Sequence, residues 1–336
     1  MTITTTPAEV RPGRRVRRTA LLTLLTLPGL AWAVFRALGW EPGYAVMVMA
    51  FTPYVAAWTL VPLIAALIAR KWLIAAVAAL AVIMLGGAVL PRALGGATEQ
   101  QGVPLTVMTI NMFFGRADPA SVVRLVREHD VAVLAVQEFT PHAADGLAAA
   151  GLGDLLPYKA LADEAGTTGS GLYSRYPMTG QGSQRFHGDN LQPGNMQAYA
   201  TIQPPGATAV TIESAHPLAP YSKEALPSWR ADLEEEPRPS GNGTPRILLG
   251  DFNSTLDHAP LRELISDGYR DAADTVGKGL IATWGPYDGK PIPPVTLDHV
   301  LADERIGVRD VQVHKVTGSD HRSVIASVTL PVAGGA

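Results

Sequence analysis

The sequence contains no cysteine at any of its 336 positions. Disulfide bonds, thiolate nucleophiles and cysteine-ligated zinc are therefore excluded from its structure and chemistry. Charged residues are also scarce, at 17% of the chain against roughly 25% in soluble domains. The formal net charge is −3, so the chain lacks the broad basic excess that binds long polyanions. Nucleic acid is therefore not expected as a partner.

Apolar residues, in contrast, make up 47% of the chain and concentrate in its N-terminal third. Three apolar runs cover residues 20–38, 43–69 and 72–90. About 20 residues of helix suffice to cross the hydrocarbon core of a bilayer. We therefore predict three transmembrane helices within residues 19–92, which form a membrane anchor. The alternatives are a cleaved signal peptide for the first run, or buried helices of a soluble protein.

Basic residues near the ends of the apolar runs predict how the chain is oriented in the membrane. Five arginines precede the first run: Arg11, Arg14, Arg15, Arg17 and Arg18. The link at Glu41 and Pro42 has no basic residue, whereas Arg70 and Lys71 separate the second and third runs. This pattern predicts a multi-pass protein of the cell membrane, with residues 1–18 in the cytoplasm and the C-terminal domain outside it. Arg92, after the third run, is a contrary signal.

Beyond a polar, glycine-rich linker at residues 93–102, the hydrophobic pattern changes to short strands, which predicts a separate domain at residues 103–332. A helix is expected at residues 119–128, with Asp118 as N-cap and Pro119 in the first position. Residues 234–244 are predicted to form a polar loop. Strands alternating with a few helices indicate a layered α/β domain. The expected strands are 103–110, 131–136, 208–214, 246–249, 298–301 and 324–330.

Polar side chains stand at the ends of most of these apolar strands, where rigid elements can present them to a shared cleft. In chain order they are Asn111, Glu138, His216, Asp251, Asn253, Asp298, Asp320 and His321. Any one of them alone is compatible with a turn or a helix cap. The complete set in this order is the informative feature.

This order resembles the endonuclease/exonuclease/phosphatase superfamily, which includes DNase I-like nucleases and bacterial sphingomyelinases. The resemblance rests on Gly-Asp-Phe-Asn at residues 250–253, Ser-Asp-His at residues 319–321, and Gly-Ser-Gly-Leu-Tyr-Ser-Arg-Tyr-Pro-Met at residues 169–178. Thr283 and Trp284 resemble a further family segment. The resemblance covers about residues 103–332 and implies a four-layer α/β sandwich of the DNase I type with two packed sheets.

The resemblance also implies roles that agree with the chemistry of phosphoester hydrolysis, which needs charge neutralisation and an activated water. Glu138, with Asn111 beside it and Asp320 as a further oxygen ligand, is expected to bind Mg²⁺, with Mn²⁺ or Ca²⁺ as alternatives. His321 is expected to act as acid/base or to stabilise the transferring group, oriented by Asp298. The remaining roles fall to Asp251, which would activate the water, and to Asn253 and His216, which would contact phosphate oxygens.

Other residues are expected to matter less. His299 should point away from Asp298, because neighbouring side chains on a strand alternate. Trp229 and Arg230 are expected to approach the mouth of the substrate site. Four histidines are expected at the surface: His142, His187, His258 and His314.

The combination of anchor and catalytic domain resembles the VanJ-type membrane proteins of actinobacteria, which are linked to teicoplanin resistance. It implies action on a lipid-linked phosphate or diphosphate at the outer face, with undecaprenyl diphosphate hydrolysed to the monophosphate as the leading hypothesis. Protein partners are left open. The alternatives are an extracytoplasmic nuclease or sphingomyelinase-like phosphodiesterase, and an inactive domain that binds an envelope ligand.

Overall fold

The protein is described by a computed structural model that covers residues 13–98, 100–286 and 291–334. Arg11, part of the predicted basic N-terminus, lies outside the described residues. The chain forms two compact units. The helical unit comprises residues 1–38 and 52–88, and the sandwich unit comprises residues 39–51 and 89–336.

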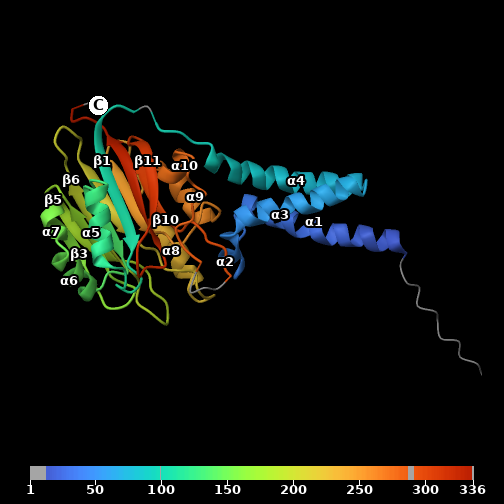
Figure 1. The fold of residues 1–336 in the computed structure, drawn as a ribbon, viewed down its shortest axis with the longest axis horizontal. Coiled ribbons are helices and arrows are strands. Elements are labelled where there is room, and N and C mark those ends of the chain that lie inside the picture. The colour runs from blue at the N-terminus through green and yellow to red at the C-terminus, as the bar shows by residue number, and fades with distance from the viewer. Residues whose placement is uncertain (1–12, 99, 287–290, 335–336) are drawn as a thin grey trace, which may run out of the picture. The chain divides into compact units, whose positions relative to one another are not determined.

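The helical unit contains three helices, α1 (Arg14–Leu38), α3 (Thr52–Ile68) and α4 (Trp72–Val89) (Figure 1). Two of them are long and apolar enough to cross a membrane, over Arg15–Leu38 and Trp72–Ala93. The helix α3 is apolar but has only 17 residues. Within this unit α1 and α3 are joined by a hydrogen bond from the Trp32 indole to the Thr52 hydroxyl, at 2.9 Å.

The second predicted apolar run is not one helix, and that expectation was wrong. Its first part, up to Phe51, belongs to the sandwich unit and contains the short helix α2 (Ala45–Met49). Val46 is 1% exposed and packs in a hydrophobic cluster of that unit. Apolar composition cannot distinguish a lipid-facing helix from a segment that enters a protein core, so the sequence pattern merged the two.

The sandwich unit contains two six-stranded mixed sheets. The strand order is β11-β12-β1-β2-β4-β3 in the first sheet and β5-β6-β7-β8-β10-β9 in the second. The strands of the first sheet are β1 (Val103–Asn111), β2 (Val133–Gln137), β3 (Tyr158–Ala162), β4 (Ser170–Ser174), β11 (Gly307–Lys315) and β12 (Arg322–Leu330). The strands of the second sheet are β5 (Met178–Arg185), β6 (Met196–Ile202), β7 (Val210–Ala215), β8 (Arg246–Asp251), β9 (Tyr269–Asp271) and β10 (Asp298–Asp303).

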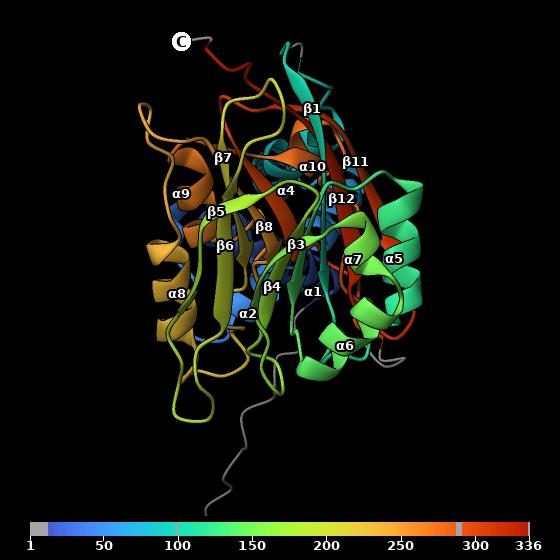
Figure 2. The ribbon, with the colours of Figure 1, turned by 90° about the vertical axis from the view of Figure 1, so that its left-hand side faces the viewer.

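Helices cover the outer faces of both sheets, so the unit has four layers (Figure 2). Beside the first sheet lie α5 (Pro119–Glu128), α6 (Pro141–Ala149) and α7 (Leu152–Leu155). Beside the second lie α8 (Leu226–Glu235) and α9 (Ala259–Ser266), while the short α10 (Ala272–Thr275) follows β9. Aliphatic side chains from both sheets fill the space between them. The predicted α/β sandwich is thereby confirmed.

Most predicted elements form as expected. The helix α5 has the predicted bounds, and the Asp118 carboxylate accepts a hydrogen bond from the Ser121 backbone N–H, as an N-cap does. Every residue of β2 is buried, which agrees with its continuous apolar run. The predicted polar loop at residues 234–244 is partly wrong, because α8 continues to Glu235 and Glu236 is 1% exposed. Glu236 accepts a hydrogen bond from the Gln197 amide, a contact that the local sequence does not reveal.

The segments next to the helical unit in the chain are bound firmly within the sandwich unit. Arg92, in the 3-10 helix η1 (Leu90–Ala93), is 5% exposed and pairs with Asp257. The backbone N–H of Thr98 donates to the Val308 carbonyl at 2.8 Å, so part of the expected linker lies along β11. The positive charge of Arg92 is therefore used inside the fold and is a poor indicator of membrane orientation.

Candidate active site

The polar strand-end residues border or support one cavity of about 580 Å³ in the sandwich unit. In the first sheet, the parallel neighbours β1 and β2 end at Asn111 and just before Glu138. In the second sheet, the parallel pair β7 and β8 ends just before His216 and at Asp251. Carboxyl ends of parallel strands meet at one edge, which brings distant residues together. The cavity is bordered by Glu138, His216, Asp251, Asn253, Asp320 and His321.

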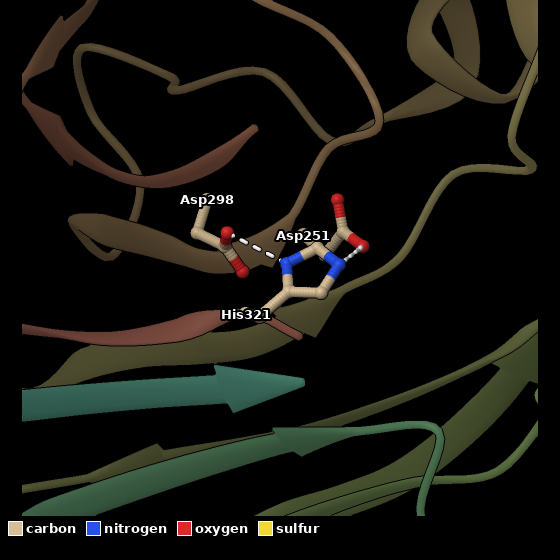
Figure 3. A group of neighbouring side chains, drawn as sticks. All are labelled: Asp251, Asp298 and His321. Carbon is tan, nitrogen blue, oxygen red and sulfur yellow. Dashed lines mark hydrogen bonds and ion pairs between the residues drawn. The ribbon is translucent and has the colours of Figure 1, made fainter. Parts of the chain in front are cut away.

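His321 lies between two aspartates (Figure 3). Its Nδ1 is 2.8 Å from Oδ2 of Asp298, and its Nε2 is 3.5 Å from Oδ2 of Asp251. Burial lowers the pKa of His321, but the carboxylates of Asp298 and Asp251 outweigh it and raise the pKa to about 10. His321 is therefore a protonated imidazolium at neutral pH, oriented by Asp298.

His216, in contrast to His321, is a neutral imidazole. Its Nε2 is 3.9 Å from Oδ2 of Asp251, and its Nδ1 has no hydrogen-bond partner among the described residues. Burial lowers the pKa of His216 to about 4, because the Asp251 carboxylate only partly offsets the loss of solvent. The site thus offers one charged and one neutral imidazole.

Asn111 and Glu138 form the side of the site that belongs to the first sheet. The Asn111 amide donates to Oε1 of Glu138 at 3.1 Å and to Oδ2 of Asp251 at 3.0 Å, so it links the two sheets. Oε2 of Glu138 accepts from the Phe114 backbone N–H at 2.7 Å. Burial raises the pKa of Glu138 despite these hydrogen bonds. A bound cation would compensate the buried carboxylate.

The environment of Asp320 also favours a bound cation. Its Oδ2 accepts a hydrogen bond from the Trp284 indole at 3.1 Å, and its buried Oδ1 has no partner within the described part of the chain. Burial raises the pKa of Asp320. Glu138 and Asp320 offer hard oxygen donors of the kind that Mg²⁺ prefers, whereas the side-chain oxygen of Asn111 accepts from the Phe113 backbone N–H at 2.8 Å. The residues present therefore fit a divalent cation.

A second set of potential ligand atoms, from Asp251, Asp298 and His321, lies within 4.8 Å of one another. Two of these three residues, His321 and Asp298, are in contact at 2.8 Å.

Several supporting contacts could not be predicted from local sequence. The Thr283 hydroxyl accepts from the backbone N–H of Asp298 at 3.0 Å. The Ser319 hydroxyl donates to the Asn111 carbonyl at 2.7 Å and accepts from the His321 backbone N–H at 3.0 Å. Trp229 was expected at the mouth of the site, but it is fully buried and its indole donates to the Ser254 hydroxyl at 3.1 Å. Trp229 therefore supports the loop after Asn253 through Ser254.

The predictions for His299 and His258 have different outcomes. His299 is buried with Nδ1 2.6 Å from Asp271, whereas its neighbour Asp298 bonds His321, so the two side chains serve different contacts. His258 was expected at the surface, and that expectation was wrong. It is 2% exposed, its Nε2 donates to the Val46 carbonyl at 2.8 Å, and its Nδ1 accepts from the Thr255 N–H at 2.8 Å. Val46 lies more than 200 positions earlier in the chain than His258.

Apolar side chains also border the cavity. Met47, Ala50 and Phe51 come from the segment at residues 39–51, and Val295 and Leu297 come from the loop before β10. The pocket surface is mostly apolar and carries a smaller number of polar groups, as is common in sites for organic ligands.

The model of the endonuclease/exonuclease/phosphatase family matches residues 108–321. Similar solved structures include a family protein from Leptotrichia buccalis, with 15% identity, coverage of 67% of this chain and 100% of that chain, and a TM-score of 0.52. A family protein from Beutenbergia cavernae has 18% identity, coverage of 68% and 72%, and a TM-score of 0.51. A humanized TDP2 from D. rerio has 15% identity, coverage of 67% and 99%, and a TM-score of 0.54. These structures share the fold. A search of curated proteins finds no match.

Proposed function

The chain belongs to the endonuclease/exonuclease/phosphatase family, and on this premise we propose that it is a membrane-anchored, metal-dependent phosphoesterase that hydrolyses a lipid-linked phosphate or diphosphate. The observation that carries this proposal is the arrangement of His321 between Asp298 and Asp251, in a cavity that Glu138 and Asp320 also border. It combines a charged acid, a carboxylate base and buried oxygen donors in one site. An acid, a base and stabilisation of the phosphate charge each favour hydrolysis of a phosphoric ester.

The residues divide the work of an in-line displacement. Asp251 orients the attacking water and accepts its proton while the water oxygen forms a bond to phosphorus. The neutral His216 and the Asn253 amide hold phosphate oxygens. The His321 imidazolium stabilises the transferring group or gives its proton to the oxygen whose bond to phosphorus breaks, and Asp298 keeps its ring in position.

Glu138, Asn111 and Asp320 would hold the metal ion. When bound, Mg²⁺ neutralises phosphate charge and polarises the phosphorus–oxygen bond. Mn²⁺ or Ca²⁺ are the alternatives that an oxygen-rich ligand set allows.

The chain path supports three membrane crossings. Residues 39–51 bind the same compact unit as residues 89–336, so both segments lie on one side of a membrane. The two helices between them, α3 and α4, then cross together or not at all. The helix α4 is long enough to cross. The 17 residues of α3 reach the lower end of the spanning range of about 17–25. With the basic residues of the N-terminus in the cytoplasm, the sandwich unit lies outside the cell.

A lipid-linked substrate follows from this location, because an anchored enzyme meets membrane substrates at high effective concentration. The resemblance to VanJ-type membrane proteins favours undecaprenyl diphosphate, cleaved to the monophosphate during recycling of an envelope lipid carrier, with a role in glycopeptide resistance. The largely apolar border of the cavity supports the same substrate class.

The test is phosphate release from undecaprenyl diphosphate by the full-length protein in detergent micelles. We expect release with Mg²⁺ and none after addition of EDTA. Glu138→Gln should lower the rate by about 100-fold or more, since it removes a carboxylate ligand and its charge. The matched control Glu128→Gln, on the exposed face of α5, should keep the wild-type rate.

The alternative functions predict different results when the same protein is assayed on the lipid, on DNA and on sphingomyelin. Strong cleavage of DNA, with no phosphate released from the lipid, would replace the proposal by a nuclease, and hydrolysis of sphingomyelin alone would indicate a phosphodiesterase. An inactive binding domain would release no phosphate, and Glu138→Ala would leave its ligand binding intact.

A further inference from the structure

The segment at residues 39–51 contributes one wall of the active-site cavity. Met47, Ala50 and Phe51 border the same cavity as Glu138 and His321. We propose that this wall is the binding subsite for the hydrocarbon chain of the substrate, next to the phosphate. This inference rests on the proposed hydrolysis of a lipid-linked phosphate and assigns residues of this chain to substrate selection.

The wall is held rigidly by contacts within the sandwich unit. Val46 is buried in the cluster beside the second sheet, and its carbonyl accepts the 2.8 Å hydrogen bond from His258. The Glu41 carboxylate accepts a hydrogen bond from the Ala259 backbone N–H at 2.7 Å, at the first residue of α9. These two anchors hold the α2 turn on which Met47 lies. The segment is therefore a fixed part of the site.

The chemistry of the wall selects an apolar ligand. Met47 and Phe51 are half-buried, and Ala50 has no polar side-chain group. A substrate without a hydrocarbon part would leave these side chains facing water. A lipid chain would cover them, and burial of apolar surface is favourable by about 25 cal/mol per Å². Methionine also adapts its shape to flexible apolar ligands.

The segment that forms the wall lies between two apolar helices in the chain, which favours a membrane lipid as its ligand. Leu38 ends α1 immediately before the segment, and Thr52 begins α3 immediately after it. A cavity of about 580 Å³ falls in the range of about 300–1,000 Å³ that suits a small organic ligand. It accommodates the phosphate and the first part of a chain, while the remainder of a polyprenyl chain stays outside it.

The experiment compares two soluble probes of different chain length, farnesyl diphosphate and isopentenyl diphosphate, with the full-length protein in detergent. The readout is the ratio of kcat/KM for the long chain to that for the short chain. We expect Met47→Ser and Phe51→Ser each to lower this ratio by about tenfold, mainly through KM for farnesyl diphosphate. Val48→Ser is the matched control, because Val48 lies in the same helix, is 45% exposed and does not border the cavity.

The outcomes separate the subsite from the proposed function. If wild type hydrolyses neither probe nor undecaprenyl diphosphate, the proposed function fails. If wild type is active and the Met47 and Phe51 variants leave the ratio unchanged, the hydrolase stands and the subsite is overturned. A fall of the ratio in Val48→Ser as large as in the two wall variants also overturns it.

A second measurement does not depend on turnover or on the stability of the serine variants. A photoreactive benzoylphenylalanine placed at Met47 should crosslink to radiolabelled undecaprenyl diphosphate, and the same group at Val48 should not. Equal labelling at both positions would show that the lipid contacts the segment without entering the cavity, and would contradict the subsite.

Discussion

Arg92 and Asp257 form a buried ion pair in which two guanidinium nitrogens bond the two carboxylate oxygens, at 2.9 and 2.6 Å. Arg92 closely follows α4 in the chain, and Asp257 lies in the loop that follows Asp251 and Asn253. Glu41 bonds the end of the same loop at Ala259. The two segments through which the chain passes into the sandwich unit are therefore both attached to the loop behind the active site.

We expect Arg92→Ala to destabilise the sandwich unit strongly. It would remove the two guanidinium hydrogen bonds to the buried Asp257 carboxylate, and breaking a buried pair costs about 3–5 kcal/mol. Thermal unfolding, followed by tryptophan fluorescence, measures the loss. Arg124→Ala is the control, because Arg124 pairs with Glu128 on the surface, where such a pair contributes about 0–1 kcal/mol. Equal shifts of the unfolding midpoint in the two variants would contradict the assigned role.

Trp284→Phe should weaken metal binding more than it slows the chemical step. The variant removes the indole hydrogen bond that orients Asp320, and loss of such an outer contact costs about 10–100-fold in metal affinity. The measurement is the Mg²⁺ concentration for half-maximal phosphate release, which should rise at least about tenfold, with kcat largely recovered at saturating Mg²⁺. Tyr158→Phe, on the exposed start of β3, serves as control. An unchanged Mg²⁺ dependence would show that Trp284 does not support metal binding through Asp320.

The His299–Asp271 pair predicts a pH-dependent stability. Burial lowers the pKa of His299, but the Asp271 carboxylate outweighs it and raises the pKa above its ordinary value. The folded protein therefore holds this proton more tightly than the unfolded chain. The pair stabilises fully below the unfolded-state pKa of about 6.5, and its contribution is lost as pH rises through the folded-state pKa.

The corresponding measurement compares wild type with His299→Gln. The difference between their unfolding midpoints should be larger near pH 6 than near pH 9. His314→Gln, on β11, should show the opposite trend, because burial and the neighbouring His129 lower the pKa of His314. A difference for His299→Gln that grows with pH would reverse the sign and refute the assignment.

The absence of cysteine makes the membrane topology directly testable. Lys71→Cys lies between α3 and α4, and Lys159→Cys lies on β3 of the sandwich unit. Three crossings place residue 71 inside and residue 159 outside, so an impermeant maleimide on intact cells should label only Lys159→Cys. Labelling of both positions would show that α3 and α4 do not cross.

The sequence placed the candidate site residues at the ends of strands, because each follows a short apolar strand whose pattern is local. Asn111, Glu138 and Asp251 could be placed at strand ends from neighbouring residues alone. Which side chains support them could not be predicted in this way. The Ser319 hydroxyl reaches the Asn111 carbonyl across 208 positions, and that separation leaves no local signal.

The sequence by itself determined a layered α/β domain and the apolar N-terminal third, because strand periodicity and hydropathy depend on near neighbours. The sandwich and the set of residues suited to phosphoester chemistry came from the family resemblance that the order of the motifs carries. Only the tertiary structure decided that residues 39–51 leave the apolar run and enter the sandwich unit. The deciding contacts are the burial of Val46 and its hydrogen bond with His258, which is itself buried against expectation. A buried apolar segment and a membrane-spanning one have the same composition, and only the partners brought by the fold distinguish them.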